Sequence, residues 1–576
     1  MQHSVLLLLL ASGLSAAEGP GGKLDPALVD LSSSTQSIDV IVQYRHIPTD
    51  ADHNRAAARG GELRHSLGII RAAHYAIPAN QLQALADDPN VEFIAPDRAV
   101  KGLATNSYIG SPDYGWHTVG ADLATSVYGL NGAGVGIALL DSGINNDPDL
   151  NGTIGSRIVY STSLIPNSDP NDHYGHGTHV SGILAGNGQQ STGGKSTYEI
   201  RGIAPRANLV SIKVLGDTGT GTDSTVIAGI ELAIQLKTKY NIRVMNLSVG
   251  RPITTSYQLD PLCQAVQQAW QAGIVVVVAA GNDGRDNSFG NNGYGTITAP
   301  GNSPYAITVG AMNTMGTATP ADDKITSYTS KGPTLIDHIV KPDLVAPGNR
   351  VFSLNAGGSY FDKTYPTNGV AQQDYTSSSS KGGNQYFVLS GTSMATPMVA
   401  GAAALMIQQN PALTPDQIKA RLMKTATKFA PGFSMATDPT TGITYTDEYD
   451  IFTIGAGYLN IPAALQSSDS FSGAALSPTA TYHGLTQTIG LEATSGWGSS
   501  ATWGSSAVWG TSEGWGLSAV WGSSVFVNGT SVWGSSTSWG LSAVWGSSAI
   551  WGSSAVWGTG GKVGSEATTV AILGDN

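Results

Sequence analysis

The sequence contains little cysteine, little charge and no long hydrophobic run. Cys263 is the single cysteine among 576 residues, so no intramolecular disulfide bond can form. Charged residues make up 12% of the chain, and the net charge of −12 leaves no basic patch to offset the repulsion of phosphates. These shortages exclude a disulfide scaffold and argue against a nucleic-acid partner. Cys263 itself lies in a helical pattern, and we expect it to be a buried, unreactive thiol.

The longest apolar run stands at the start of the chain. Val5-Leu-Leu-Leu-Leu-Leu-Ala-Ser-Gly-Leu14 is about half as long as a bilayer-spanning helix, which needs roughly 20 residues. The small residues Ser15-Ala-Ala17 follow it, a pattern that predicts a secretory signal over residues 1–17. We therefore expect an exported protein without a membrane span. An ordinary N-terminal tail is the alternative, because no Lys or Arg precedes the run.

Apolar runs and helical stretches alternate through the middle of the chain. Four near-continuous runs rich in β-branched residues predict strands covered on both faces: residues 134–140, 208–215, 242–247 and 273–280. Helical patterns at 224–237 and 261–271 lie between them. This alternation predicts an α/β domain with a parallel sheet, whose reactive groups belong at the carboxyl ends of the strands. Asp141 directly follows the first run, and Asn282 follows the last by two residues.

Three short motifs supply the groups that acyl transfer needs. They are Ala138-Leu-Leu-Asp-Ser-Gly143 with a carboxylate at Asp141, Gly175-His-Gly-Thr-His-Val-Ser-Gly182 with an imidazole at His176, and Gly391-Thr-Ser-Met-Ala-Thr-Pro397 with a hydroxyl at Ser393. A serine hydroxyl becomes a good nucleophile when an imidazole removes its proton, and a carboxylate orients that imidazole. Ser393 also begins an apolar run that predicts a buried helix, whose N-terminus favours developing negative charge. Helix capping is the alternative role for Ser393, and turn formation is the alternative for Asp141.

From about residue 105 to about residue 465 the chain resembles a subtilisin-like serine protease, or subtilase. The order Asp…His…Ser is that of subtilisin. Further family-like segments are Lys213-Val-Leu-Gly216, Gly219-Thr-Gly221, Met245-Asn-Leu-Ser-Val-Gly250, Ala279-Ala-Gly-Asn-Asp283 and Lys341-Pro-Asp-Leu-Val-Ala-Pro-Gly348. The resemblance implies an α/β peptidase with a parallel sheet, in which Asp141, His176 and Ser393 form the catalytic triad. It also implies that no cofactor takes part in catalysis.

The same resemblance assigns the remaining site residues. Asn282 would donate its side-chain amide to the oxyanion, with the backbone N–H of Ser393 as second donor; a loop asparagine in a Gly-Asn-Asp-Gly turn is the alternative. Two segments would pair with an extended substrate through main-chain hydrogen bonds, which implies a broad specificity for protein and peptide substrates. These segments consist of Gly219, Thr220, Gly221, Ser248, Val249 and Gly250. Ala280 and Gly281 would belong to the walls of the side-chain pocket.

A small α+β unit is expected over residues 36–100, after a Gly-, Ser- and Pro-rich linker at 18–35. Its pattern predicts strands near residues 38–44, 72–77 and 91–95, and helices around residues 61–66 and 80–86. The unit resembles the inhibitory propeptide of subtilases. This implies a self-processing precursor that its own propeptide inhibits and that is cut between about Val100 and Pro112. A separate adhesion or docking domain is the alternative.

Metal binding has two weaker signals. His176 and His179 lie one helical turn apart, but no Cys-rich cluster and no His-Glu-x-x-His accompanies them. We therefore assign no metal ligand and expect His179 to be structural. Asp149 resembles a family calcium ligand, which leaves a structural calcium ion open, although the polar loop at 186–201 does not align with the family's calcium loop. A Gly-, Ser- and Tyr-rich insertion at 355–386 either borders the cleft or decorates the surface.

The C-terminal part of the chain is repetitive. Beyond a linker at 466–495, residues 496–560 repeat Ser-Ser-Ala-Val-Trp-Gly and hold most of the chain's 12 tryptophans, with Val527 in one missing position. A period of six keeps the rings on one face of a strand but turns them in three directions on a helix. We expect short stacked strands or a low-complexity tail, followed by residues 561–576. Such a tail would bind sugar, the cell surface or other copies, or act as a spacer.

The sequence therefore predicts a secreted serine endopeptidase made as a precursor, either free or held at the cell surface by its tail. Activity should rise as His176 loses its proton, which gives a neutral to alkaline optimum. One rival is an adhesive, surface-binding protein whose protease serves only self-processing. An inactive protease-like fold is a second rival, and it conflicts with the presence of a suitable residue at every catalytic position.

Overall fold

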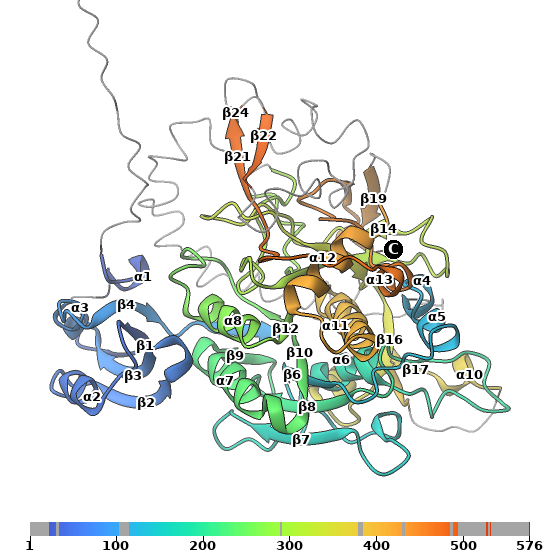
Figure 1. The fold of residues 1–576 in the computed structure, drawn as a ribbon, viewed down its shortest axis with the longest axis horizontal. Helices are drawn as coiled ribbons and strands as arrows, with labels where there is room; N and C mark the ends of the chain where they lie inside the picture. The colour runs from blue at the N-terminus through green and yellow to red at the C-terminus, as the bar shows by residue number, and fades with distance from the viewer. Residues whose placement is uncertain are drawn as a thin grey trace, which may run out of the picture.

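The computed structural model describes residues 22–29, 31, 34–102, 115–288, 291–377, 384–428, 433–483, 488–492, 526–527, 530–531 and 575. A small four-stranded unit near the N-terminus packs against a larger α/β domain (Figure 1). The expected signal at 1–17 and residues 103–114, where most of the expected cleavage range falls, lie outside the described residues. So do the Trp repeats, apart from two strands that pair with each other, β23 (Phe526–Val527) and β24 (Thr530–Ser531). The strand array expected for the tail stays a prediction.

The N-terminal unit (residues 37–96) is an antiparallel sheet in the order β2-β3-β1-β4. Its strands β1 (Ser37–Tyr44), β3 (Ala72–Pro78) and β4 (Val91–Pro96) occupy the three predicted positions, and α3 (Leu82–Ala86) follows a short 3₁₀ turn. The helix expected at 61–66 is wrong, because this segment is β2 (Glu62–Leu67). It is an edge strand with five exposed residues, so it carries no apolar alternation.

The first helix of the unit is α2 (Asp50–Ala57), in a segment too polar to show a helical apolar face. A capping box between Thr49 and Asp52 starts it. The expected linker at 18–35 is also shorter than predicted. Helix α1 (Pro26–Val29) buries Leu28 in the core of the unit, and the backbone N–H of Asp25 donates to Ile94 at 2.9 Å.

The larger domain is built on an eight-stranded sheet in the order β14-β13-β12-β10-β6-β8-β7, with β15 paired to β13. The four predicted runs form β6 (Gly136–Asp141), β8 (Asn208–Lys213), β10 (Ile242–Leu247) and β12 (Val275–Ala279). The other strands are β7 (Ile158–Ser163), β13 (Ile307–Asn313), β14 (Lys324–Ile325) and β15 (Leu344–Pro347). All neighbours pair in parallel except β13 and β14. The predicted α/β fold with a parallel sheet is confirmed.

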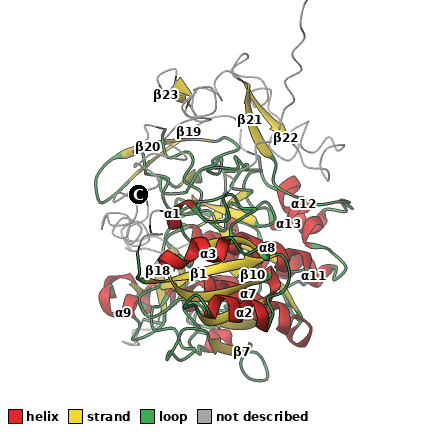
Figure 2. Ribbon diagram, turned by 90° about the vertical axis from the view of Figure 1, so that its left-hand side faces the viewer, coloured by secondary structure: helices red, strands yellow, loops and turns green. Residues whose placement is uncertain are grey.

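Helices cover both faces of this sheet. The pair α7 (Asp223–Tyr240) and α8 (Pro261–Gln271) lies between the sheet and the N-terminal unit (Figure 1), and Figure 2 views the molecule from the side of that unit. The pair α6 (His176–Ala185) and α11 (Thr392–Gln409) packs on the other face. Helix α8 has the predicted bounds because Asp260 caps its N-terminus and Pro261 fills its first turn. Helix α11 is buried along most of its length, as predicted.

Shorter elements complete the domain. They are α4 (Gly115–Thr118), α5 (Ala121–Ser126), β16 (Val351–Leu354), α9 (Tyr360–Thr364), β17 (Gly369–Val370), α10 (Gln372–Tyr375), β18 (Tyr386–Leu389), α12 (Pro415–Thr425), β19 (Phe433–Thr437), β20 (Thr444–Glu448) and α13 (Ile461–Gln466). The expected linker at 466–495 is instead packed on the domain as far as β21 (Thr479–His483), which pairs with β22 (Thr488–Glu492). Ser477 is buried and donates to the Asp343 carboxylate at 2.6 Å, which fixes this segment to the sheet.

The single thiol lies inside the domain. Cys263 is 1% exposed, and its Sγ lies 3.1 Å from Oδ1 of Asn302. Burial raises the pKa of Cys263 well above its ordinary value, so the reactive thiolate is disfavoured, as expected from the sequence.

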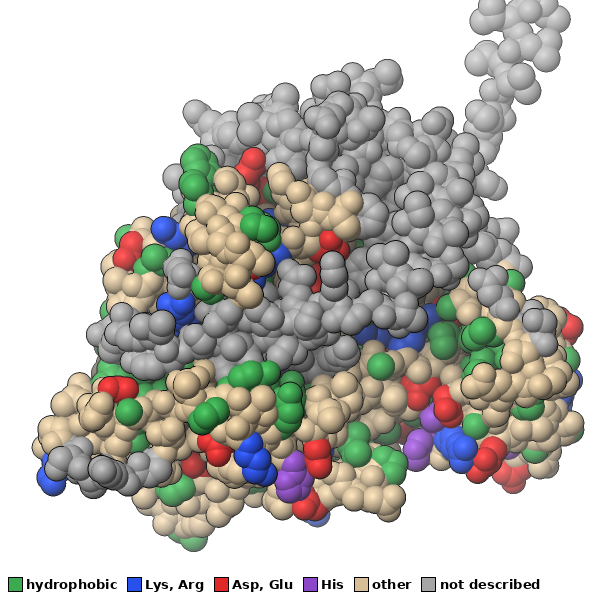
Figure 3. All heavy atoms as spheres, turned by 180° about the vertical axis from the view of Figure 1, so that it is seen from behind, with side chains coloured by type: hydrophobic (Ala, Val, Ile, Leu, Met, Phe, Trp, Pro, Cys, Tyr) green, Lys and Arg blue, Asp and Glu red, His purple; other side chains and the backbone are tan. Residues whose placement is uncertain are grey.

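The surface agrees with the low charge of the sequence. On the face in Figure 3, acidic and basic side chains are interspersed, and no basic patch gathers over the part of the chain that is described. Within the same residues, no helix combines the length and the apolar character that a bilayer crossing requires.

Candidate active site

Asp141 and His176 meet at the carboxyl edge of the sheet. Asp141 is the last residue of β6, and His176 is the first of α6. His176 Nδ1 lies 2.7 Å from Oδ1 of Asp141, which also accepts the backbone N–H of Ser142 at 2.7 Å. A carboxylate facing Nδ1 fixes the hydrogen on that nitrogen and leaves Nε2 as the proton acceptor. Nε2 is buried and has no hydrogen-bond partner among the described residues, so its acceptor position is open.

Ser393 is the second residue of α11, directly after Gly391-Thr392. Its hydroxyl donates to the backbone carbonyl of Ser248 at 3.2 Å rather than to His176. In return, the Ser248 hydroxyl donates to the backbone carbonyl of Ser393 at 3.0 Å. The structure therefore joins two members of the predicted triad directly and holds the third against the end of β10. Catalytic hydrogen bonds of this kind often form only when substrate is bound.

Asn282 is anchored to the helix that carries Ser393. Its Oδ1 accepts the backbone N–H of Thr392 at 3.0 Å and the Thr392 hydroxyl at 3.0 Å. Because the carbonyl end of the side chain is held in this way, the amide nitrogen is the end that presents donors. The amide and the backbone N–H of Ser393 thus belong to neighbouring positions, as an oxyanion hole requires.

A buried carboxylate that the sequence analysis missed holds the His176 turn. Asp172 accepts backbone N–H groups of Gly175 at 2.7 Å and of Thr178 at 2.8 Å, and the Ser142 hydroxyl at 2.8 Å. The Ser142 hydroxyl in turn accepts the backbone N–H of Gly177 at 2.9 Å. Burial raises the pKa of Asp172, although its hydrogen bonds oppose the change. An aspartate shortly before the first turn of a helix is a capping signal that the sequence could have offered.

His179 has a structural place, as the sequence analysis expected. Its Nε2 donates to the backbone carbonyls of Val351 and Phe387, each at 3.1 Å, and so ties α6 to β16 and β18. Burial is the largest cause that lowers the pKa of His179 to about 3, which keeps the ring neutral. Among the residues with described positions, no group of three or more His, Cys, Asp and Glu side chains could hold a metal ion.

Asp149, the residue that resembles a calcium ligand, is hydrogen-bonded within the protein. One carboxylate oxygen accepts the backbone N–H of Gln190 at 2.8 Å, and the other accepts the hydroxyl of Tyr386 at 2.6 Å. Each oxygen keeps a further lone pair, so a calcium-binding role for Asp149 stays a prediction. Burial is the main cause that raises the pKa of Asp149 to about 6. Tyr386 is the last residue of the insertion at 355–386, so the insertion supplies the hydroxyl that donates to Asp149.

The insertion also borders the His176 turn. The backbone N–H groups of Tyr360 and Phe361 donate to the carbonyls of His173 and Tyr174, at 2.8 and 3.1 Å. The ring of Phe361 lies 4.4 Å from that of Tyr174. The insertion is therefore part of the wall beside the candidate base.

The two expected substrate-binding segments flank a third segment of the chain. Strands β9 (Thr220–Thr222) and β11 (Val249–Gly250) pair antiparallel with β5 (Ala99–Gly102), which lies between them in the order β11-β5-β9. Lys101 stands opposite both Thr220 and Gly250, and Gly102 stands opposite Val249. Backbone from the N-terminal part of the chain therefore occupies the place that was predicted for an extended peptide.

Close contacts and backbone conformation explain why small residues occur in these segments. A side chain on Gly221 would place its Cβ 2.2 Å from the carbonyl oxygen of Val214, and Gly219 has φ +72°. Ala280 and Gly281 lie between β12 and Asn282, where Gly281 has φ +114° and accepts the backbone N–H of Ser330 at 3.0 Å. Their assignment to pocket walls stays a prediction.

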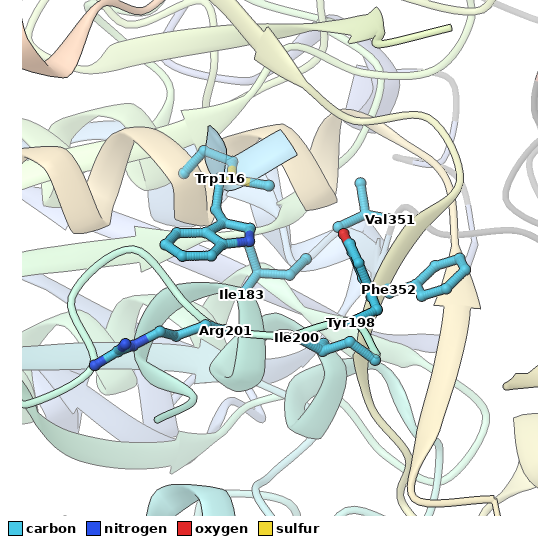
Figure 4. Close-up of a pocket in the computed structure, with 8 residues that line it drawn as sticks. Trp116, Ile183, Tyr198, Ile200, Arg201, Val351 and Phe352 are labelled. Atoms are coloured by element: carbon cyan, nitrogen blue, oxygen red, sulfur yellow. The ribbon is translucent and has the colours of Figure 1, made fainter. Parts of the chain in front are cut away.

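A separate small pocket lies behind the catalytic helices (Figure 4). It is lined by Trp116, Ile183, Tyr198, Ile200, Arg201, Val351, Phe352 and Met398. Ile183 is two helical turns along α6 from His176, about 10 Å of helix, so this pocket is distinct from the catalytic groups.

Comparison with known proteins places this geometry in a family. The subtilase family model matches residues 132–451, more than half of the chain. Serine protease AprX of Bacillus subtilis (strain 168) is 43% identical over 307 residues, which cover 52% of this chain and 62%, less than two thirds, of AprX. Subtilisin E of the same organism is 32% identical over 409 residues, which cover 71% of this chain and 84% of subtilisin E.

A solved structure agrees with these matches at the level of the fold. It is fervidolysin from Fervidobacterium pennivorans, described as a keratinolytic enzyme related to subtilisin. The TM-score is 0.54 at 22% identity, and the match covers 75% of this chain and 61% of fervidolysin. Together with the buried Asp141–His176 pair and the position of Ser393, these matches show that the chain belongs to the subtilase family of serine proteases.

Proposed function

We propose that the protein is an exported endopeptidase made as a self-processing precursor, in which residues 36–102 inhibit the catalytic domain. The observation that carries this proposal is the position of β5 between β9 and β11, where the backbone of residues 99–102 pairs on both sides. A peptide held in this way is read through its main chain, which is how a protease with broad specificity binds substrate. Export rests on the apolar run at the start of the chain, in residues 5–14.

The attachment of the N-terminal unit supports an inhibitory role. The carboxylate of Asp97 accepts the backbone N–H of Ser224 at 2.7 Å and its hydroxyl at 2.6 Å, at the positive end of α7. At the start of the neighbouring helix α8, Gln43 donates to the carbonyl of Leu259 at 3.1 Å and accepts from Gln264 at 3.2 Å. Ile41 and Leu67 join the main hydrophobic core of the domain. These contacts are non-covalent, so they would keep β5 between β9 and β11 even after the chain is cut.

The register of β5 leads to a specific cleavage site. Gly102, the last described residue of β5, is opposite Val249, the chain neighbour of Ser248. The carbonyl of Ser248 is the group that accepts the Ser393 hydroxyl. We therefore assign the peptide bond between Leu103 and Ala104 as the bond that the precursor cleaves, within the range expected from the sequence.

The proposed chemistry uses four groups, those of Asp141, His176, Asn282 and Ser393. The Ser393 hydroxyl turns from Ser248 to His176, gives its proton to Nε2 and attacks the carbonyl carbon of Leu103. The resulting oxyanion accepts from the Asn282 amide and from the backbone N–H of Ser393. His176 then returns the proton to the nitrogen of Ala104 as the C–N bond breaks, and water hydrolyses the acyl-enzyme. Asp141 stabilises the imidazolium throughout.

Comparison of the wild type with Ser393→Ala tests the proposal. Both chains are expressed in full, and their intact masses, N-terminal sequences and casein cleavage are followed over time, with Ser126→Ala as a control at an exposed site. We expect a new N-terminus at Ala104 in the wild type and the control only, together with casein cleavage. Equal processing in Ser393→Ala would refute self-cleavage by Ser393. A mature N-terminus elsewhere would refute the register assignment but not the protease.

A further inference from the structure

The penultimate residue of the chain, Asp575, is fully buried against the catalytic domain. One oxygen of its carboxylate lies 2.9 Å from Nη2 of Arg285 and accepts the hydroxyl of Ser327 at 2.7 Å. The other oxygen accepts the backbone N–H of Ser327 at 2.6 Å. Three donors therefore surround a single aspartate from a distant part of the sequence.

The backbone of Asp575 is recognised as well as its side chain. The Asn349 amide accepts the backbone N–H of Asp575 at 2.9 Å through Oδ1 and donates to its carbonyl at 3.1 Å through Nδ2. One side chain thus pairs with both main-chain groups of one residue, as a neighbouring strand would. Asn349 is itself 3% exposed, so the arrangement is part of the interior.

Arg285 belongs to the domain with or without Asp575. It is 5% exposed, its Nε donates to the Ser327 hydroxyl at 2.8 Å, and its Nη1 lies 3.1 Å from a carboxylate oxygen of Asp438. The rings of Tyr328 and Tyr445 each lie 5.9 Å from the guanidinium. A planar guanidinium held by these neighbours presents a fixed donor to a second carboxylate. The site is therefore organised by residues of the domain itself.

The site adjoins the segment that carries Asn282. The backbone N–H of Gly284 donates to Tyr328 at 2.9 Å, and that of Ser330 donates to Gly281 at 3.0 Å. The Tyr328 hydroxyl donates to the carbonyl of Gly348 at 3.0 Å. Residues 326–330, which bind Asp575 through Ser327, thus also pair with the loop of the candidate oxyanion hole.

We infer that Arg285, Ser327 and Asn349 form a receptor site for a C-terminal segment of the chain's own, which inserts Asp575. Described residues before and after the Trp repeats, in β21 and at Asp575, then both contact the catalytic domain. The occupant is recognised by its carboxylate and by its own backbone N–H and carbonyl. This inference does not rest on the proposed self-processing.

The first test measures protection of the C-terminus in the full chain, in a Ser393→Ala background that prevents self-digestion. A carboxypeptidase is added, and mass spectrometry follows release of residue 575. Each rate is divided by that of a free peptide with the same terminal sequence, which removes the preference of the carboxypeptidase. We expect protection to fall at least tenfold in Asp575→Asn. It should not change in Asp374→Asn, an exposed control.

The second test supplies the ligand in trans. A synthetic peptide of residues 569–576 is titrated into the Asp575→Asn chain, and the same peptide with Asn for Asp is the control. Saturable binding of the first peptide alone is expected, and Ser327→Ala should weaken it. Equal protection of Asp575→Asn and the wild type, or equal binding of both peptides, would overturn the inference. A dimer that exchanges C-termini between copies would overturn attachment within one chain.

Discussion

The two ends of the chain reach the catalytic domain through different chemistry. Residues 99–102 are held by backbone pairing with β9 and β11, which depends little on side chains. Asp575 is held by an arginine, a serine and an asparagine that recognise one carboxylate and one residue of backbone. The first attachment lies next to Ser248, which accepts the Ser393 hydroxyl, whereas the second adjoins the segment that carries Asn282. Under our two proposals, the segment to be cut is recognised through its backbone, and the segment to be retained is recognised through one specific side chain.

The largest expected effect is a loss of stability at one of two buried arginine sites, around Arg251 and around Arg285. Arg251 follows β11 and forms ion pairs with Asp223 and Asp260. All three residues belong to the catalytic domain. Arg251→Met leaves two buried carboxylates without a cation and should lower the free energy of unfolding by about 3–5 kcal/mol. Asp575→Asn leaves Arg285 paired with Asp438 and should cost only about 1–3 kcal/mol.

Urea denaturation in the Ser393→Ala background measures both values. Arg64→Met is the control, because Arg64 pairs with Glu62 at the exposed surface and should change stability by less than about 1 kcal/mol. Equal losses for Arg251→Met and Asp575→Asn would mean that the C-terminal aspartate is as integral to the fold as Asp223 and Asp260.

Asn282→Ala should slow cleavage of the precursor and leave the attachment of Asp575 unchanged. Loss of one oxyanion donor lowers kcat by about 10²–10³, a range that comes from a subtilisin, so cleavage after Leu103 should slow by that factor. Protection of residue 575 should stay at the wild-type level. Intact mass over time measures the first quantity and carboxypeptidase release the second, with Asn54→Ala as an exposed control. A mutant that processes at the wild-type rate would remove Asn282 from the oxyanion hole.

Asp149 extends the comparison to a buried carboxylate whose side chain bonds a tyrosine instead of an arginine. Burial raises the pKa of folded Asp149 from its ordinary value of 3.8 to about 6, so the folded state binds this proton more tightly than the unfolded state. The stabilisation is complete below about pH 4 and is lost as pH rises through 6. Asp149→Asn should therefore gain about 2–3 kcal/mol relative to the wild type between pH 4 and pH 7.

Chemical denaturation at the two pH values measures this gain in the Ser393→Ala background. Asp374→Asn, at the exposed surface, should show no such change with pH. A difference between Asp149→Asn and the wild type that is constant with pH would show that Asp149 is ionised in both states.

The smallest effect is expected at residue 101. Lys101→Thr changes the side chain of a residue that pairs through its backbone, so the rate of precursor cleavage should change by less than about threefold, or under 1 kcal/mol. Intact mass over time provides the rate. A loss of tenfold or more would show that the cleft selects side chains at this position, and the contrast between the two ends would then weaken.

The motifs and the buried strands were predictable because their signals are local. Runs such as residues 273–280 are apolar on both faces of the sheet, and Asp141, His176, Asn282 and Ser393 each lie among small residues. The polar helix α2 and the exposed edge strand β2 have no such pattern, which explains the errors there. Leu28 and Ser477 were assigned to linkers because their burial depends on residues far away in sequence.

Two site features had no readable signal. The bond of the Ser393 hydroxyl to Ser248 depends on how β10 and α11 meet in space. Asp575 is a single acidic residue after a repetitive tail, and its partners lie more than two hundred residues earlier. Pairings at such separation follow from the tertiary fold and not from local composition.

The isolation of Cys263 gives the molecule a practical property. Because its thiol is enclosed and stays protonated, a cysteine introduced at the surface would be the fastest-reacting site for thiol-directed dyes. Asn576→Cys would place one fluorophore beside Asp575 without competing background label. Its emission would then report attachment and release of the C-terminus in real time, in the intact protein and at equilibrium.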